Sequence, residues 1–410
     1  MRQVTLQGMR WYGNRPRTIF FPDRWEVEVL MPPGFSRPAL DPGEIAAAVA
    51  APIGSPTLGE LAARAREAVI VFDDMTRITP VSEVLPPVLA EMEAAGLSPD
   101  RIRLIPALGM HGAMNNLDFR NKLGDRVLRR YQVFNHNPYE NCILAGNTPS
   151  GTPVYLNREF MECDLRVGIG SIAPHVNAGF GGGGKILLPG ISGHQTIKAF
   201  HGEVAQRNPG ATGMGVVEGN PLFQEILEVT KMSGLQFKVD VLLNLSGGIT
   251  HVFAGDPIRA HACGIEEARI HCATPPSTGN DIVVLNAYAK YNELYVCLPG
   301  AYTAVNYQGG TIVMLVDAPD GQVCHYLMGR FGKEYGGFSY DGLRELPETV
   351  KLVICTAYPD RSMCNMITDI DRVIVTGNWD ETLELLERDH PGEARVVVLP
   401  DGTMQYFRFE

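Results

Sequence analysis

The sequence predicts an α/β protein built from two α/β domains, with the active site in the cleft between them. First, apolar runs bounded by turn residues alternate along the chain with amphipathic stretches of helical period. Second, the chain has 410 residues, a length typical of two domains. Third, residues 274–281 (TPPSTGND) concentrate proline, serine and glycine and interrupt this alternation. We therefore expect an N-terminal domain over residues 1–274 and a C-terminal domain over residues 275–410.

The N-terminal region is expected to begin with β structure and then to alternate. Residues 24–33 (RWEVEVLMPP) alternate in polarity before two prolines, which is typical of a strand. Residues 44–54 (EIAAAVAAPIG) and 58–67 (LGELAARARE) predict helices. The apolar run 68–74 (AVIVFDD) is typical of a parallel strand buried on both faces. Its two closing aspartates stand where open α/β sheets place functional groups.

The later segments continue the alternation in both expected domains. In the first, we expect a helix at 82–96, a strand and loop at 101–112, a helix at 116–131, a strand and loop at 165–179, a strand pair at 237–255 and a helix at 261–273. In the second, strands are expected within 281–288, 311–319, 350–358, 372–378 and 394–402.

Charge and composition narrow the function classes. The formal net charge of −11 would repel the phosphate backbone of DNA or RNA, so no nucleic-acid partner is expected. No apolar run resembles a secretory signal or a membrane span, so we expect a cytoplasmic protein without a membrane partner. The eight cysteines include no CxxC pair, which argues against a zinc ribbon. These features favour an enzyme that acts on a small substrate.

The densest group of reactive side chains lies within residues 173–202 (APHVNAGFGGGGKILLPGISGHQTIKAFHG). Four glycines precede Lys185, and glycine lets the backbone approach a ligand closely. A desolvated lysine amine forms adducts with carbonyl-type carbons. His175 and His201 offer imidazoles for proton transfer or for binding nickel, copper or zinc. The segment therefore predicts a covalent or metal site, and a surface lysine on a flexible loop is the plain alternative.

A phosphate-binding P-loop is the other interpretation of this segment. Gly179 to Lys185 fits the spacing GxxxxGK, but Ile186 stands where a serine or threonine should hold Mg²⁺. Pro189 and Gly190 also follow where the motif should open a helix. The sequence therefore disfavours a P-loop nucleotidase.

Two further motifs follow expected strands. Residues 71–80 (VFDDMTRITP) place two carboxylates, a hydroxyl and a guanidinium close together. Either they cap a loop before a helix, or they recognise ribose and phosphate. Residues 107–114 (ALGMHGAM) place His111 in a loop between a strand and a helix, a position typical of active-site residues in α/β proteins.

Together these segments resemble the nickel-pincer-nucleotide-dependent lactate racemase family. DDMTR at 73–77 resembles the family's DDxTR motif. GMHG at 109–112 resembles its glycine–histidine loop, where the family more often has an arginine after the histidine. HVNAGFGGGGK at 175–185, followed by LPGISG, resembles its histidine, glycine and lysine segment. THVFAGDP at 250–257 is also similar, so the resemblance covers nearly the whole chain.

The resemblance implies a cofactor, nickel bound to pyridinium-3,5-bisthiocarboxylic acid mononucleotide (the nickel-pincer nucleotide). Lys185 would hold it covalently and His201 would be the protein's metal ligand. The residues implied to line the nucleotide are Asp74, Met75, Thr76 and Arg77. The enzymes that build and load the cofactor are the implied partners. The N-terminal domain would hold the cofactor, and the C-terminal domain would close over the substrate.

The resemblance also implies a reaction, the racemisation or epimerisation of a small anionic 2-hydroxy acid. Reversible hydride transfer to the cofactor would produce a planar 2-keto acid. His111 and His175 would be the catalytic acid–base pair, one on each face of the substrate.

The substrate implied by the resemblance is not lactate itself. Within residues 286–300 (NAYAKYNELYVCLPG), Asn292 and Pro299 stand where the family's lactate racemases have a glutamine and a lysine that help bind substrate. Proline supplies no positive charge, so we expect another 2-hydroxy acid, such as a sugar acid or an aromatic hydroxy acid. The candidate substrate contacts are Arg77, Tyr288, Lys290, Tyr291 and Asn292.

Two other functions stay open. The same cofactor would serve another redox or elimination reaction of a hydroxy acid, or the protein would bind the nickel cofactor without turnover. Mere binding requires neither His111 nor His175, so the presence of both favours catalysis.

Overall fold

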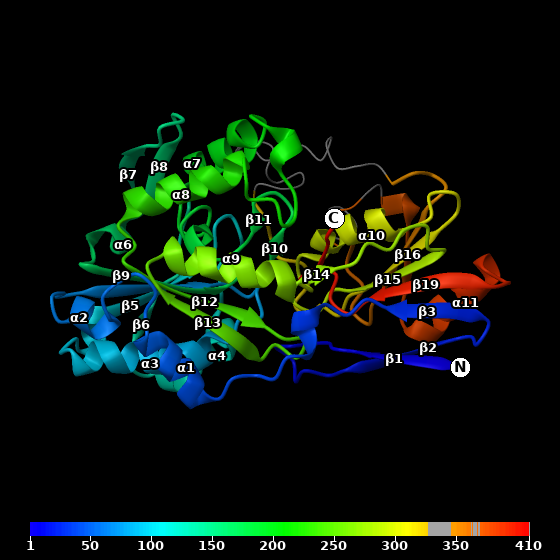
Figure 1. Ribbon diagram of the computed structural model, residues 1–410, viewed down its shortest axis with the longest axis horizontal. Coiled ribbons are helices and arrows are strands. Elements are labelled where there is room, and N and C mark those ends of the chain that lie inside the picture. Colours follow the sequence, from blue (N-terminus) through cyan, green and yellow to red (C-terminus); the bar gives the residue numbers. More distant parts are fainter. Residues whose placement is uncertain (327–345, 362, 364–366, 368–369, 410) are drawn as a thin grey trace.

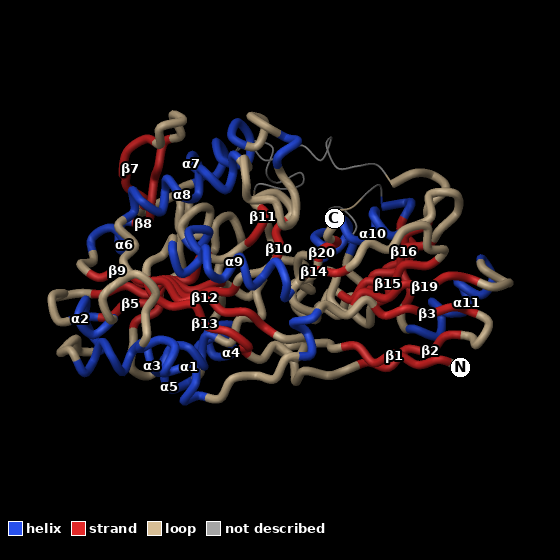
Figure 2. The backbone as a smooth tube through the Cα atoms, viewed as in Figure 1, coloured by secondary structure: helices blue, strands red, loops and turns tan. Residues whose placement is uncertain are grey.

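The protein has two lobes, each built around a six-stranded sheet (Figure 1). The computed structural model describes residues 1–326, 346–361, 363, 367 and 370–409. Helices and strands alternate through both lobes, which confirms the predicted α/β class (Figure 2). The division at residue 275 and the cleft between domains stay predictions. Among the described residues, no helix is long and apolar enough to cross a bilayer.

The first sheet has the order β13-β12-β9-β4-β5-β6. Its strands are β4 (Ala68–Asp73), β5 (Ile102–Ala107), β6 (Gln132–Val133), β9 (Leu165–Ser171), β12 (Phe237–Leu243) and β13 (Ile249–Gly255). All neighbouring pairs are parallel except β12 and β13, which form the expected antiparallel pair. The carboxyl ends of β4, β5 and β9 therefore lie at one edge, where the loops carrying the predicted site residues begin.

The second sheet has the order β18-β17-β16-β15-β19-β3 and is wholly parallel. Its strands are β3 (Trp25–Val29), β15 (Ile282–Asn286), β16 (Thr311–Leu315), β17 (Lys351–Cys355), β18 (Val373–Thr376) and β19 (Ala394–Leu399). The N-terminal strand β3 pairs with β19, so blue and red ribbons lie side by side in Figure 1. A strand from the first thirty residues thus completes the C-terminal sheet, although its chain position lies within the expected first domain.

The helices and small strand pairs surround the two sheets. The α-helices are α1 (Pro42–Ala50), α2 (Leu58–Ala62), α3 (Val81–Ala94), α4 (Asn116–Leu123), α5 (Asp125–Leu128), α6 (Arg158–Glu162), α7 (His194–Ala199), α8 (Pro221–Ser233), α9 (Arg259–His271), α10 (Leu298–Ala304) and α11 (Trp379–Asp389). The two-stranded pairs are β1 (Arg2–Leu6) with β2 (Arg17–Phe21), β7 (Cys142–Asn147) with β8 (Pro153–Asn157), β10 (Pro174–His175) with β11 (Gly179–Phe180), and β14 (Ala273–Thr274) with β20 (Tyr406–Phe407).

Both central sheets are covered on two faces. Ile70 and Phe72 of β4 pack in one apolar cluster with α1 and α3, and the intervening Val69 and Val71 pack in another cluster with α8. Successive side chains of a strand point to opposite faces, so one apolar run contributes to two cores. Each fully buried aliphatic side chain stabilises the fold by roughly 1.5–3 kcal/mol. These cores hold rigid the strands from which the site loops emerge.

The helix expected at 116–131 is instead two helices. α4 ends at Leu123 and α5 begins at Asp125, with Gly124 between them at φ +83°. A positive φ is easily adopted by glycine and interrupts a right-handed helix. The break lets α4 direct Lys122 into the protein, where it is fully buried.

Candidate active site

Asp74 and His111 follow two neighbouring strands and meet at the edge of the first sheet. Asp74 comes directly after β4 and His111 lies in the loop after β5. The His111 Nδ1 and Asp74 Oδ2 atoms are 2.6 Å apart. The other Asp74 oxygen accepts hydrogen bonds from the Thr76 N–H at 3.0 Å and the Thr76 hydroxyl at 2.5 Å. The buried carboxylate is therefore engaged within the protein and fixes the orientation of the imidazole.

Carboxylates keep His111 protonated. Its Nε2 lies 3.4 Å from Glu293 Oε1. Burial alone would lower the pKa of His111, but the Asp74 and Glu293 carboxylates outweigh burial and raise the pKa to about 10. Both ring nitrogens therefore carry protons at neutral pH, and Nε2 is the one that can be donated to a substrate.

A buried lysine shapes the loop after β4. Lys122 of α4 donates hydrogen bonds to the backbone carbonyls of Asp74 at 2.9 Å and Arg77 at 2.7 Å. Its ammonium also pairs with Asp73 at 2.8 Å, and the second Asp73 oxygen accepts a 2.5 Å hydrogen bond from the Thr79 hydroxyl. Sequence analysis missed this role of Lys122, because lysines are rarely buried without a partner and the partners lie far away in the chain.

Glu293 connects the second lobe to the first. It follows β15, its side chain is 6% exposed, and its Oε2 accepts a 2.8 Å hydrogen bond from Arg77 Nη1. Burial favours the neutral acid, but Arg77 and His111 outweigh burial and hold the pKa of Glu293 well below its usual range. The site therefore contains an ionised carboxylate between two cations. Sequence analysis named its neighbours but not Glu293, because its partner Arg77 is 216 residues away.

Lys185 stands on a glycine loop that packs tightly between buried groups. The loop forms a short 3₁₀ turn, Gly183–Ile186. Gly183 has φ +51°, and a Cβ there would collide with the His261 ring. A Cβ on Gly184 would fall inside van der Waals contact with the Thr230 hydroxyl of α8. Close packing therefore requires these glycines, and no α-helix opens here as a P-loop would demand.

Buried charges lie beneath the same loop. The Gly183 N–H donates to Asp240 Oδ2 at 2.9 Å, and Asp240 Oδ1 pairs with Lys238 Nζ at 2.5 Å. Both side chains of this ion pair are 0% exposed. A buried ion pair whose geometry is satisfied fixes the backbone that it contacts. The loop is thus anchored from below, unlike the flexible surface loop considered as an alternative.

The Lys185 ammonium is destabilised by its surroundings. Burial, followed by the positive charges of Arg77 and Lys290, lowers the pKa of Lys185 to about 7. Its Nζ lies 6.0 Å from the centre of the Phe200 ring. At neutral pH, Lys185 is therefore a neutral amine in a large fraction of the protein molecules. The neutral amine is the nucleophilic form of lysine.

His201 lies next to this lysine on a π-helical turn, Phe200–Val204, that continues α7. Single π-helical turns are frequent at functional sites. Its Nδ1 lies 3.0 Å from the Ile197 carbonyl oxygen, so the ring proton sits on Nδ1 and the lone pair on Nε2. Burial and the Lys185 charge lower the pKa of His201 to about 4, so the ring is neutral. A metal-binding histidine typically has this tautomer, with its other nitrogen donating to a carbonyl.

His175 has the opposite proton state to His111. Its Nδ1 accepts hydrogen bonds from the N–H groups of Asn177 at 3.2 Å and Ala178 at 3.1 Å. Burial, then the charges of Lys185 and Lys290, hold its pKa well below the usual range. His175 is therefore neutral, with its ring proton on Nε2.

The predicted substrate contacts of the second lobe divide into two groups. The Tyr288 hydroxyl donates to Asn14 Oδ1 at 2.9 Å, and the Tyr291 hydroxyl donates to Asp320 Oδ2 at 3.1 Å. Both rings are 2% exposed. Their hydroxyls are thus engaged with residues outside the histidine and lysine group.

Lys290 and Asn292 have different surroundings. Lys290 is 4% exposed, and burial followed by the Arg77 charge lowers its pKa to about 8. Asn292 is also 4% exposed, and its Oδ1 has no hydrogen-bond donor among the described residues. A buried cation suits an anionic group, and the unsatisfied amide oxygen suits a hydrogen-bond donor such as a hydroxyl.

His325 is a further member of the group, although no motif in the sequence singles it out. The segment after β16 runs beside the His111 loop, with hydrogen bonds from Gly112 N to Cys324 O and from Tyr326 N to Met110 O, both 2.9 Å. The His325 and His111 ring centres are 5.0 Å apart, edge to face. Its Nδ1 is buried and has no hydrogen-bond partner in the described part of the chain. Burial, then the His111 charge, lowers its pKa to about 3.

Comparison with known proteins shows that much of the chain is similar to lactate racemases. The model of the lactate racemase N-terminal domain matches residues 12–213. Curated lactate racemases from Thermoanaerobacterium thermosaccharolyticum and Lactiplantibacillus plantarum are 33% and 31% identical, over 276 and 277 residues. These matches support a lactate racemase-like family for the chain. Each alignment spans 66% of this chain and 64% of the relative.

Solved structures extend the likeness of this lactate racemase-like chain to its whole fold. The lactate racemase apoprotein from T. thermosaccharolyticum superposes with a TM-score of 0.76, covering 99% of this chain and 100% of that chain at 23% identity. A crystal structure of a Thermotoga maritima protein gives a TM-score of 0.67, covering 90% of this chain and 99% of that chain at 18% identity. The two-sheet architecture is therefore shared with lactate racemase.

The lactate racemase-like fold brings most predicted site residues into one electrostatic group. Lys185, His175 and His201 lie close enough to influence one another's protonation, as do Arg77 and Lys290. Met75 differs, because its side chain is 8% exposed and packs in the apolar cluster beneath β4. Glu293 and His325 join the group without having been predicted.

Proposed function

We propose that the protein is a racemase or epimerase of a 2-hydroxy acid that works through a nickel-pincer nucleotide tethered at Lys185. The main observation behind this proposal is that Lys185, with a pKa of about 7, lies near His201. The His201 ring proton is on Nδ1, so its Nε2 lone pair is the one that would bind a metal. The match to the lactate racemase N-terminal domain and the likeness to two curated lactate racemases support the same conclusion.

The residues fit the proposed cofactor. Lys185 offers a neutral amine for the covalent bond, and His201 offers an imidazole nitrogen for nickel. Arg77 uses Nη1 for its hydrogen bonds to Thr76 and Glu293, and its other N–H groups suit a phosphate or a carboxylate. When bound, the cofactor supplies a hydride acceptor, which a 2-hydroxy acid needs because its C2 hydrogen is too weakly acidic for an imidazole to remove.

The two histidines would handle the hydroxyl proton. His111 begins protonated, with Asp74 stabilising its charge, so its Nε2–H is the proton donor on one side. His175 begins neutral and is the acceptor on the other side. Its Nε2 already carries the ring proton, so the proton must be accepted at Nδ1, which first gives up its hydrogen bonds from the Asn177 and Ala178 N–H groups. Opposite proton states in one site are the arrangement expected of an acid–base pair.

Lys290 would anchor the substrate carboxylate. Attachment of the cofactor removes the charge of Lys185, and Arg77 is already paired with Glu293. Lys290 has no ion-pair partner among the described residues and lies within electrostatic reach of His175. It therefore provides the positive charge that Pro299 cannot supply.

The proposal is tested by intact mass and nickel content of protein co-expressed with the cofactor-building enzymes. We expect a covalent mass gain and about one nickel per chain for the wild type, and neither for Lys185→Ala. Lys231→Ala is the matched control, since Lys231 is exposed on α8 and pairs only with Glu228 in the described structure. Absence of the adduct from the wild type, while a known lactate racemase loads normally, would refute the proposed cofactor.

A further inference from the structure

We propose that Glu293 and His325 select a 2-hydroxy acid that carries a further hydroxyl group beyond its reacting carbon, as a polyhydroxylated sugar acid does. This inference rests on the proposed function, because it names the substrate class of the same site. Its basis is the pair of polar groups that the second lobe places beside His111 and that neither donate nor accept the substrate proton in the proposed function.

Glu293 has more capacity to accept hydrogen bonds than the protein uses. A carboxylate offers roughly four acceptor positions. Oε2 accepts one short hydrogen bond, from Arg77 at 2.8 Å. Oε1 accepts only a long hydrogen bond, from the Tyr295 hydroxyl at 3.4 Å, and lies 3.4 Å from His111 Nε2. Oε1 is therefore without a short donor among the described residues, although its carboxylate is 6% exposed and ionised.

His325 supplies a second unsatisfied polar group. Its ring lies against His111, and its Nδ1 is buried without a hydrogen-bond partner in the described part of the chain. The charges of both His111 and Glu293 influence its protonation, so the three side chains share one neighbourhood. A buried nitrogen left unpaired is unfavourable, and a hydrogen bond to a substrate hydroxyl would remove that penalty.

These two groups distinguish the substrate classes that the sequence left open. An aromatic or methyl tail would leave the remaining acceptor capacity of Glu293 unused and the His325 imidazole nitrogen without a partner, which is unfavourable. A second substrate carboxylate would be repelled by Glu293. A hydroxyl group donates to a carboxylate and also accepts or donates at an imidazole nitrogen, so it satisfies both groups. The geometry therefore favours a sugar acid over an aromatic hydroxy acid.

The sharpest test compares glycerate with lactate, because the two acids differ only by a hydroxyl on C3. The loaded wild-type enzyme should turn over glycerate with a kcat/KM at least about 100-fold higher, since sites built around a hydroxyl strongly reject the analogue that lacks it. Calorimetric binding of both acids to the protein should show the same order of Kd. This second readout does not depend on turnover.

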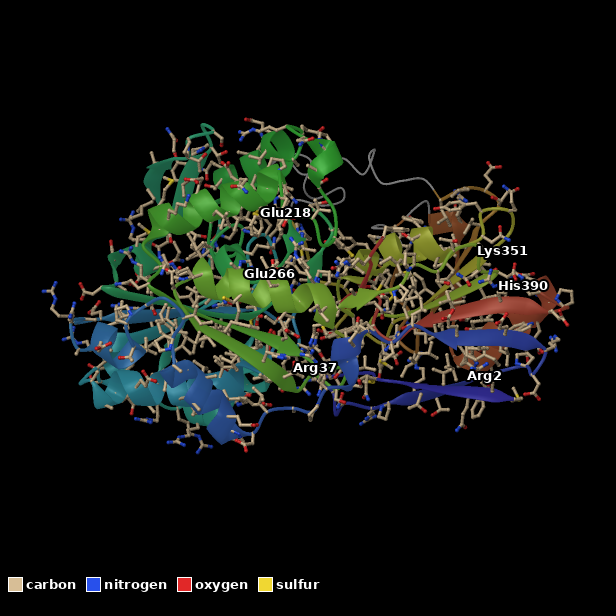
Figure 3. All side chains as sticks on the ribbon, in the orientation of Figure 1. Arg2, Arg37, Glu218, Glu266, Lys351 and His390 are labelled. Carbon is tan, nitrogen blue, oxygen red and sulfur yellow. The ribbon has the colours of Figure 1, made fainter. Side chains whose placement is uncertain are left out.

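Two variants assign the preference to its residues. Glu293→Gln removes the charge, and His325→Phe keeps the ring but removes Nδ1. Each should lower the glycerate-to-lactate ratio by about 10-fold, the effect of losing one hydrogen bond of roughly 1.4 kcal/mol. Glu266→Gln is the matched control, because Glu266 is 76% exposed on α9 (Figure 3) and should leave the ratio unchanged. Thermal unfolding of each variant checks that it is folded.

The outcomes separate this inference from the proposed function. Absence of a Lys185 adduct and of any 2-hydroxy-acid turnover would refute the proposed function. Equal Kd and equal kcat/KM for the two acids in a loaded, active enzyme would overturn the roles of Glu293 and His325 alone. Preferential use of phenyl-lactate would overturn them as well, and so would failure of both acids to bind the folded protein.

Discussion

The two histidines of the site differ in proton state because of what surrounds them. His111 faces the Asp74 and Glu293 carboxylates, which raise its pKa to about 10. His175 faces backbone N–H groups and lysine charges, which keep its pKa well below the usual range. Each imidazole thus acquires a role from its neighbours rather than from its own chemistry. Asp74 is therefore positioned to act through His111, because its carboxylate is turned to that ring.

The Asp74→Asn variant tests this arrangement. Removing the carboxylate charge should lower the pKa of His111, since Asp74 is the largest influence that raises it. Racemase activity of the loaded enzyme should fall by about 100-fold, a typical contribution of one proton-transfer group. NMR titration of the His111 ring measures the pKa directly. Asp100→Asn, an exposed change, should leave the titration unaltered, and an unshifted His111 in Asp74→Asn would contradict the assignment.

The glycine loop shows what sequence predicts at the scale of an element. The run of glycines before Lys185 predicted close approach of the backbone to a ligand. In the structure the groups that approach Gly183 and Gly184 closely are the protein's own His261 ring and the Thr230 hydroxyl of α8. DDMTR and GMHG were correctly placed after strands. The partners Lys122, Glu293 and His325 were not predicted, because each acts on a segment distant in sequence. Single-segment patterns predict loops, whereas contacts between loops require the fold.

Gly184→Ala tests the packing of this element. The new Cβ would overlap the Thr230 hydroxyl and press on Ile226, and overpacking of this kind typically costs about 1–3 kcal/mol. We expect lower stability by urea unfolding and reduced nickel loading, because Lys185 follows directly. Gly210→Ala is the control, since a Cβ there meets nothing within 4 Å. Full stability of Gly184→Ala would show that the loop has more room than the structure indicates.

In the whole molecule, the site residues lie in loops that follow the carboxyl ends of parallel strands in both central sheets. β4, β5 and β9 lead to Asp74, His111 and His175, and β15 leads to Glu293. The strands were predictable, because buried parallel strands are continuous apolar runs. The crossing of β3 into the second sheet was not, because its pairing with β19 leaves no local signature. That crossing ties the two ends of the chain together within one lobe.

The buried histidines predict weak acid stability. Burial lowers the pKa of His136 and of His271 to about 4, and these residues are 3% and 0% exposed. As the pH falls from 6.5 towards 5, the unfolded chain binds protons that the folded chain does not. Stability should therefore fall by about 1.4 kcal/mol per histidine per pH unit. His111 does not oppose this trend. Its raised pKa stabilises the folded state, but below pH 6.5 this contribution is at its full value and no longer changes with pH.

Urea unfolding at pH 7, 6 and 5 measures this effect. His136→Gln should weaken the dependence of the unfolding free energy on pH, by the amount that corresponds to the binding of about one proton. This holds whatever the effect of the substitution on stability at pH 7. Equal slopes for the variant and the wild type would show that His136 is already protonated in the folded state.

The most direct test of the central claim is the conversion of a single enantiomer of a 2-hydroxy acid in D₂O by the cofactor-loaded protein. We predict inversion at C2 without deuterium incorporation at that carbon, because the hydrogen leaves and returns as hydride while only the hydroxyl proton exchanges. Inversion that places deuterium on C2, or no inversion by a fully nickel-loaded protein, would contradict the account.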